Sequence, residues 1–340
     1  MNKKLTFLLA LTFLFLFSGS SVVFGDDFQD VVDALERQDY KEAHRLWKLS
    51  AEQGDADAQY NLGLMYEKGQ GVPQDYKEAV RWYRLAAEQG DVDAQFNLGV
   101  MFEKGRGVPQ DDKEAFNWFR LAAEQGNVEA QFNLGVMYDL GQGVPQEYQE
   151  AVRWYRLAAE QGYAPAQSNL GMMYDNGQGV PQDYKEAFKW FQLAAEQGDA
   201  FAQYNLGWMY DKGKGVPQDD KEAVKWYRLS AEQGDAFAQF ELGVMYDERL
   251  GVPQDDKEAV KWYRLSAEQG NAEAQLNLGL MYDFEQGVPQ DYVSAHMWFN
   301  LCGSSGDKDC VSSIRHIEKR MTLSQIEEAQ EMARNWKPKK

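Results

Sequence analysis

The stretch "GQGVPQDYKEAVRWYRLAAEQG" at residues 69–90 decides the fold, because near-copies of it follow one another along the 340-residue chain. Two series of glycines mark the period, and neighbours within each series are 36 residues apart. The series are Gly54, Gly90, Gly126, Gly162, Gly198, Gly234, Gly270 and Gly306, and Gly63, Gly99, Gly135, Gly171, Gly207, Gly243 and Gly279. A fixed period of this length indicates stacked structural repeats.

Each copy contains two predicted helices. The first lies within "DADAQYNLGLMYEKG" at 55–69, where apolar residues recur at spacings of four. The "GQGVPQ" segment ends it, because glycine tolerates positive φ and Pro73 favours an extended residue before it. Asp75 and Glu78 have the spacing of a capping box, which predicts a second helix that continues to Gly90.

A single hairpin of this size cannot bury its own apolar face, so each copy must present the same surface to the next. We therefore predict an all-α fold, a right-handed α-solenoid with seven repeats over 55–306. Capping helices are predicted at 26–54 and at 307–340, the latter as two helices near 308–320 and 323–336. Thr322 and Gln325 form a second candidate capping box. The apolar stripe predicted for the last helix is Ile326, Ala329, Met332 and Ala333.

The N-terminus predicts export. Lys3 and Lys4 precede an apolar run and a small-residue segment, which is the order of a signal peptide over 1–25, with an uncleaved anchor as the alternative. The mature chain is then expected in the periplasm or outside the cell, without membrane insertion. The whole chain has a net charge of −19, and removal of the two lysines makes it −21. Such an acidic protein is a poor match for nucleic acid or anionic membranes.

The segment "AQYNLGLMYEKGQGVPQDYKEAVRWYRLAAEQGD" at 58–91 resembles the SEL-one-like repeats, which are relatives of the tetratricopeptide repeats. The resemblance extends over about 27–336. It implies an exported bacterial member that acts as a non-catalytic scaffold and binds a protein or peptide in a concave groove. A basic segment and a host protein are the candidate ligands, and no cofactor is implied.

Cys302 and Cys310 are the two cysteines of the chain. Their spacing resembles the disulfides of the Helicobacter cysteine-rich proteins, a branch of the same family, and this implies a structural disulfide. His44 and His296 replace apolar residues only at the two ends of the array, which is typical of capping positions. No spacing of a metal-binding motif is present, so no metal site is predicted.

The resemblance places the first helix of each copy on the inner side of the groove. Aromatic residues there, with two of the acids that follow them, are the candidate partner-binding residues. They are Tyr60, Phe96, Phe132, Phe201, Tyr204, Trp208, Phe237, Phe240, Asp211 and Asp247. Rigid aromatic side chains are common anchors of interfaces, but these rings could also serve only to pack one repeat on the next.

An acidic residue near the end of each first helix opposes the helix dipole and needs compensation. The row is Glu67, Glu103, Asp139, Asp175, Asp211, Asp247 and Asp283. Amides of the following "GQG" loop could provide that compensation, or the row could select basic segments of a partner. Both interpretations stay open at this point.

Motifs of common enzymes, such as GxSxG and SxxK, are not found in the sequence. Some cysteine-rich relatives have been linked to β-lactams, so a hydrolase acting on β-lactams or cell-wall peptides is the alternative function. The sequence offers this alternative no nucleophile motif.

Overall fold

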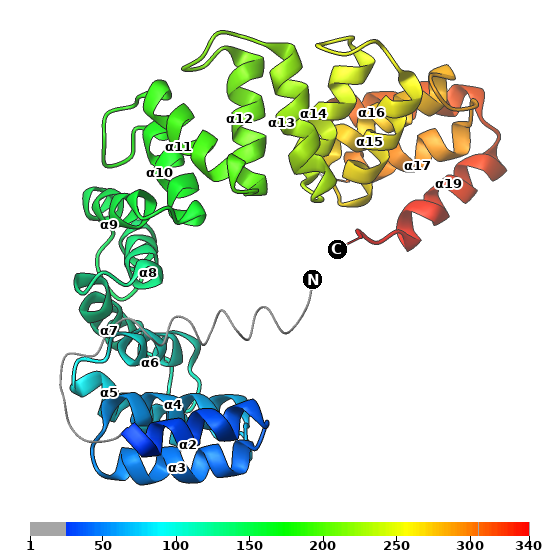
Figure 1. Ribbon diagram of the computed structural model, residues 1–340. Coiled ribbons are helices and arrows are strands. Elements are labelled where there is room, and N and C mark those ends of the chain that lie inside the picture. Colours follow the sequence, from blue (N-terminus) through cyan, green and yellow to red (C-terminus); the bar gives the residue numbers. More distant parts are fainter. Residues whose placement is uncertain (1–24, 305, 340) are drawn as a thin grey trace. The chain divides into compact units, whose positions relative to one another are not determined.

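The structure is a computed structural model that describes residues 25–304 and 306–339. These residues form eighteen α-helices and one 3-10 helix, with no strand (Figure 1). The chain divides into two compact units, up to Gln125 and from Gly126 onward, which are described separately. Apart from Gly25, the predicted signal peptide lies outside the described residues.

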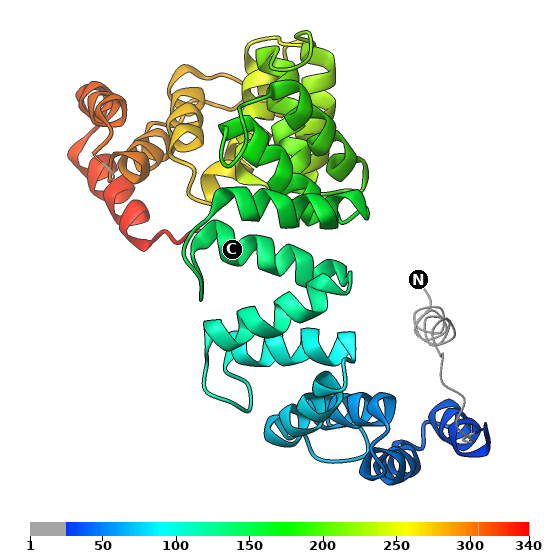
Figure 2. The ribbon, with the colours of Figure 1, turned by 90° about the vertical axis from the view of Figure 1, so that its left-hand side faces the viewer.

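The first unit contains six of these helices. They are α2 (Gly25–Glu36), α3 (Tyr40–Glu52), α4 (Ala56–Lys68), α5 (Tyr76–Glu88), α6 (Val92–Lys104) and α7 (Asp112–Glu124). Each packs against its neighbours in the chain, and the strongest packing joins the two helices of one repeat, α4 with α5 and α6 with α7 (Figure 2).

The second unit repeats the same plan. Its elements are α8 (Val128–Leu140), α9 (Tyr148–Glu160), α10 (Ala164–Asn176), α11 (Tyr184–Glu196), α12 (Ala200–Lys212), α13 (Asp220–Glu232), α14 (Ala236–Asp247), α15 (Asp256–Glu268), α16 (Ala272–Phe284), α17 (Tyr292–Gly303), α18 (Lys308–Ile317), η2 (Glu318–Arg320) and α19 (Leu323–Asn335). Hairpins stack in chain order from α8 to α17, while α19 packs against α17. The predicted all-helical solenoid of stacked hairpins is therefore confirmed within each unit.

The predicted capping of the second helices is half right. The Asp75 side chain accepts hydrogen bonds from the backbone N–H groups of Lys77 and Glu78, as an N-cap should. The reciprocal bond is not formed, because the Asp75 N–H donates to the Tyr66 carbonyl across 3.0 Å. The Glu78 carboxylate pairs instead with Arg81, with 3.2 Å between Oε2 and Nη1. At α19, by contrast, Thr322 and Gln325 form the complete box.

A glycine in each first helix lets the two helices of a hairpin approach closely. A Cβ atom on Gly63 would lie 2.6 Å from the Tyr83 ring, and one on Gly99 would lie 2.7 Å from the Phe119 ring. Both rings are completely buried. The missing side chain therefore makes room for a large, fully buried ring, and the 36-residue glycine series follows from this contact.

Two glutamines per repeat join successive hairpins. The Gln95 side chain is 4% exposed, and its Nε2 donates to the Ala87 carbonyl at the end of the preceding helix α5, across 3.1 Å. Its Oε1 accepts from Gln125, which follows α7 and whose Nε2 also reaches the Gly90 carbonyl. In the second unit, Gln203 and Gln233 make the same bonds at the position of Gln95 and Gln125. Buried amides whose bonds are all satisfied fix how one hairpin sits on the next.

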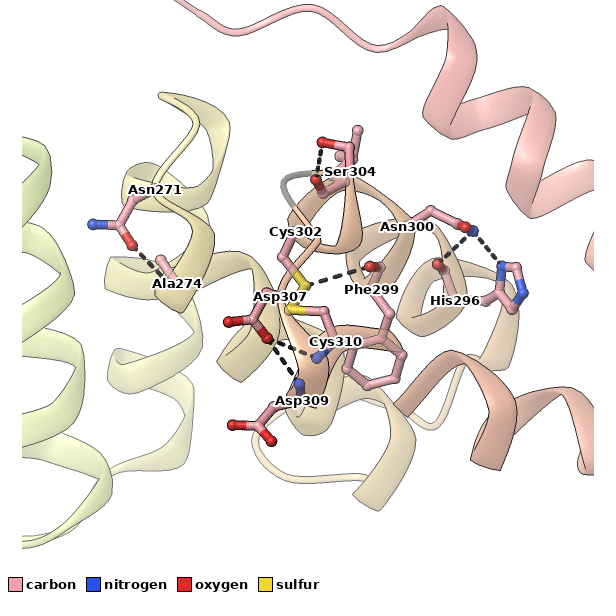
Figure 3. The surroundings of a disulfide bond; sticks show 11 residues. Asn271, Ala274, His296, Phe299, Asn300, Cys302, Ser304, Asp307, Asp309 and Cys310 are labelled. Atoms are coloured by element: carbon pink, nitrogen blue, oxygen red, sulfur yellow. Dashed lines mark hydrogen bonds between the residues drawn. A yellow bond between two sulfur atoms is a disulfide. The ribbon is translucent and has the colours of Figure 1, made fainter. Parts of the chain in front are cut away.

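The C-terminal end of the second unit is held by a disulfide bond and by polar contacts of a buried histidine. Cys302 at the end of α17 and Cys310 in α18 form the predicted disulfide, with 6.0 Å between their Cα atoms (Figure 3). His296 is fully buried and contacts Glu318 of η2 and Asn300 of its own helix, at 3.2 and 2.6 Å. The histidine at this end therefore links α17 to the terminal segment.

The predicted apolar stripe of α19 is partly wrong. Ala329 is buried and Ala333 packs on the core of the last repeats, but Met332 is 39% exposed. Trp336, just after the helix, packs there instead, with its ring centroid 6.4 Å from that of Trp298. None of the helices in the described residues is both long and apolar enough to cross a membrane.

Candidate protein-interaction surface

The first helix of each repeat carries one set of side chains that we call the first-helix surface. It consists of the residues equivalent to Asp57, Tyr60, Asn61, Leu64 and Glu67 on α4, α6, α8, α10, α12, α14 and α16. Three predicted aromatic residues on this surface each lie against the buried ring of the second helix. The ring centroids of Tyr60 and Tyr83 are 5.9 Å apart, and Phe96 and Phe132 make equivalent contacts with Phe119 and Tyr155 at 5.7 and 5.9 Å. All three are half-buried, so they support the hairpin core as well as forming part of the surface.

The predicted aromatic cluster in the fifth and sixth repeats divides into packed and exposed members. Tyr204 and Phe240 are half-buried against Tyr227 and Tyr263, at centroid distances of 5.8 and 5.9 Å. Trp208 is also half-buried and packs on the cores of both repeats. These three side chains therefore stabilise the stack, as the packing interpretation expected.

Phe201 and Phe237 differ from these three, because they are 43% and 62% exposed. The Phe237 ring lies beside Tyr204, with centroids 6.1 Å apart. The ring centroids of Phe201 and Phe191, in the preceding hairpin, are 6.4 Å apart. That hairpin has Ser168 at the position equivalent to Tyr60, where most repeats have an aromatic residue. Phe237 is thus the predicted aromatic residue with the most surface available to a partner.

The acidic row is compensated in a way that the sequence did not indicate. The Tyr83 hydroxyl donates to Glu67 across 2.5 Å, and Tyr155 donates in the same way to Asp139 across 3.2 Å. The loop acts on the backbone instead, since Gln74 Nε2 donates to the Glu67 carbonyl across 2.8 Å. In these two repeats the acid is therefore compensated by the buried tyrosine of the hairpin, and not by the loop amides that the sequence suggested.

Other members of the row have other partners. Asp247 accepts from Tyr263 across 3.2 Å, while Asp283 is 2% exposed and pairs with Arg320 across 2.5 Å. Asp211 pairs with Lys212, with 2.7 Å between Oδ2 and Nζ. The row is therefore largely a set of structural partners rather than a continuous line of free carboxylates.

Sequence reasoning missed Glu241, which stands where the other six repeats have asparagine. Those residues are Asn61, Asn97, Asn133, Asn169, Asn205 and Asn277. Burial, with the nearby Asp211, Glu273 and Glu248 carboxylates, raises the pKa of Glu241 to about 7, although Lys212 opposes the shift. The single departure from asparagine was the signal that could have identified it.

The second helices present a different charge. A hollow beside α15 is lined by Lys257, Lys261 and Arg264 together with apolar residues. The equivalent hollow beside α9 is lined by Arg153 and Arg156. The acidic first-helix surface would therefore attract cationic ligands, and these basic hollows would attract anionic ones. No three side chains of histidine, cysteine, aspartate or glutamate within 25–304 and 306–339 converge as metal ligands.

Comparison with known proteins identifies the repeats. The Sel1 repeat family matches eight segments, at 33–55, 56–91, 92–127, 128–163, 164–199, 200–235, 236–271 and 272–307. Seven of them coincide with the predicted repeats, and the shortest lies in the segment predicted as the N-terminal cap. No curated protein is similar enough to count as a match.

Solved structures include several proteins of the same kind. A Sel1 repeat protein from Oxalobacter formigenes is 35% identical over 72% of this chain and 97% of its own, with a TM-score of 0.63. A protective antigen of uropathogenic Escherichia coli with an SLR fold is 32% identical over 92% and 84%, with a TM-score of 0.49. Helicobacter pylori cysteine rich protein B is 25% identical over 38% and 92%, with a TM-score of 0.31. Matching repeats cover most of the sequence, and the chain belongs to the Sel1 repeat family.

Proposed function

We propose that this protein is a non-catalytic scaffold of the bacterial envelope, or a secreted one, that binds a protein or peptide in a groove formed by the first-helix surface of the second unit. Sel1 repeats are generally protein-interaction scaffolds. The observation that carries the proposal is the exposed ring of Phe237 beside Tyr204, with Phe201 also exposed, in a surface where Tyr204, Trp208 and Phe240 are packed. An exposed aromatic residue on a rigid helix is a suitable anchor because it loses little conformational freedom on binding.

Export supports the same proposal, since the predicted signal peptide and the Cys302–Cys310 disulfide both suit an oxidising compartment. Cell fractionation with N-terminal sequencing tests this part. A periplasmic or secreted product that begins at Asp26 is expected. An intact N-terminus in the cytoplasmic fraction would contradict the proposed location.

The binding surface is tested by affinity capture from an envelope extract, with the captured proteins identified by mass spectrometry. The bait is residues 26–340, compared with a Phe201→Ala/Phe237→Ala variant. A matched control is Leu140→Ala/Phe284→Ala, which removes two side chains of similar exposure, 60% and 59%, from other first helices. A partner held by the wild type and the control but lost by the first variant is expected. A partner held equally by all three would place binding elsewhere on the protein.

A further inference from the structure

The buried tyrosines of the hairpins have a repeated set of hydrogen-bond partners. Tyr155 donates to Asp139 on the first helix of its own hairpin, and Asn169 of the next first helix also bonds to its hydroxyl. Tyr263 has the equivalent partners Asp247 and Asn277. An acid and an asparagine therefore satisfy each phenol inside the stack, as buried polar groups require.

Tyr227 lacks this arrangement. Its side chain is fully buried, and its hydroxyl has no hydrogen-bond partner. The acid in the expected position, Asp211, is paired with Lys212, and the asparagine position of the next helix is Glu241. Asp211 and Glu241 occupy the positions of Asp139 and Asn169, the partners of Tyr155, and both carboxylates act electrostatically on Tyr227. A buried hydroxyl without a partner destabilises the protein, and a ligand with hydrogen-bonding groups would remove that penalty.

The charges around this hydroxyl favour a cation. Asp211, Glu273 and Glu248 act electrostatically on Glu241, and Lys212 opposes them. The Lys212 side chain is 52% exposed whereas that of Asp211 is 10% exposed, so Lys212 is the member of the pair that solvent reaches and that another cation could replace. Lys212 nevertheless shows that a positive nitrogen fits against Asp211.

Aromatic rings complete the surroundings. Tyr204 lies against Tyr227, and its own environment includes the charges of Glu241 and Glu273. The largely exposed Phe237 ring also lies against Tyr204. Planar cations bind well where carboxylates and aromatic faces are adjacent, because guanidinium both stacks and donates several hydrogen bonds in one plane.

We propose that Asp211, Glu241 and the Tyr227 hydroxyl, flanked by Tyr204 and Phe237, form a site that binds the guanidinium of an arginine in a partner protein. The inference rests on the proposed scaffold function and names the chemistry of its ligand. The guanidinium donates to the two carboxylates and to the phenol oxygen, while the apolar stem of the arginine lies along Phe237. It displaces Lys212 from Asp211.

The test uses three short capped peptides that differ only at the central residue, which is arginine, lysine or citrulline. Binding to residues 26–340 is followed by NMR and by calorimetry. The arginine peptide should bind at least tenfold more tightly than the citrulline peptide, which keeps the shape and loses the charge. Lysine should bind more weakly than arginine, because an ammonium cannot form the planar pair of bonds.

Variants then locate the site. Glu241→Asn restores the residue found in the other six repeats and should weaken arginine binding at least tenfold, whereas Glu160→Gln, at the exposed end of the second helix α9, should leave it unchanged. Tyr227→Phe should also weaken binding without loss of stability. Equal affinity for arginine and citrulline, normal binding by Glu241→Asn, or no binding at millimolar peptide would each overturn the site. Competition by calcium at similar concentration would identify a metal site instead and would also overturn it.

Partner capture separates this inference from the proposed function. A partner lost from Phe201→Ala/Phe237→Ala and also from Glu241→Asn supports both. A partner lost from the aromatic variant but retained by Glu241→Asn would overturn the arginine site and leave the scaffold function standing.

Discussion

The Tyr263 hydroxyl donates a hydrogen bond to the Asp247 carboxylate, with 3.2 Å between the two oxygens. Tyr227, its equivalent one repeat earlier, has no such bond. We therefore expect Tyr263→Phe to lower the free energy of unfolding by about 1 kcal/mol, and Tyr227→Phe to leave it unchanged or raise it slightly. Urea unfolding followed by circular dichroism measures both. An equal loss in the two variants would show that Tyr227 has a partner after all.

Replacement of a glycine within a first helix should be costly despite the better helix propensity of alanine. A Cβ atom on Gly99 would lie 2.7 Å from the Phe119 ring, so Gly99→Ala must displace a fully buried side chain. The expected loss is about 1–3 kcal/mol. Thermal unfolding should show that the double variant Gly99→Ala/Phe119→Leu is less destabilised than the sum of its single changes. Strict additivity would argue against the contact.

Two repeats should gain stability from a glycine that they lack. One residue of the segment just after each first helix has a left-handed conformation, and it is glycine in five repeats but Arg249 and Glu285 in the last two, with φ of 63° and 58°. Arg249→Gly and Glu285→Gly should each raise the free energy of unfolding by about 1 kcal/mol, because side chains are strained there. Glu248→Gly is the control, since φ is −90° at that residue and no strain is relieved. A similar gain in the control would contradict the explanation.

Stability should depend on pH through Glu241. Burial and neighbouring acids raise its pKa to about 7 in the folded state, above the usual value in an unfolded chain. The folded state therefore holds more protons between these two values, so the free energy of unfolding falls as the pH rises from about 4.5 to about 7. Glu241→Asn should flatten this part of the profile, measured by urea unfolding at several pH values. An unchanged slope would contradict the assignment to Glu241.

The disulfide should stabilise the last helices more than the rest of the second unit. Cys302 and Cys310 are 8 residues apart in sequence, and closing so short a loop contributes roughly 2.5 kcal/mol in the chain-entropy model. Hydrogen exchange of a Cys302→Ala/Cys310→Ala variant should show lost protection in α17 and α18. Protection in α12 and α13 should stay the same. Uniform loss across the unit would mean that unfolding is cooperative over all its repeats.

Repetition made the fold predictable. The glycine period fixed the hairpin boundaries, because a glycine that ends a helix and one that faces a buried ring both leave a visible mark in the sequence. The same constancy concealed the role of Gln59 and Gln89, because Gln59 recurs in all seven copies and Gln89 in six of them without any apolar or charged pattern. Their bonds connect residues 30 positions apart, and only the stacked structure shows them.

The candidate site was predictable in part. The sequence indicated where aromatic residues gather, but exposure separates Phe237 from Trp208, and exposure depends on how the neighbouring hairpin covers each ring. The acids were predicted as one row, whereas the structure gives them different partners. Asp247 accepts a hydrogen bond from Tyr263, and Asp211 pairs with Lys212. Glu241 required a comparison among repeats at a position with no chemical motif around it.

The buried glutamines have a consequence for how such a chain can change its length. Gln203 bonds to a main-chain carbonyl of the preceding hairpin and to a second glutamine that belongs to its own. Neither partner depends on which hairpin comes before. After duplication or deletion of a block of 36 residues, the glutamine bonds at the new junction could therefore form as before. The number of repeats can change while these junctions stay the same.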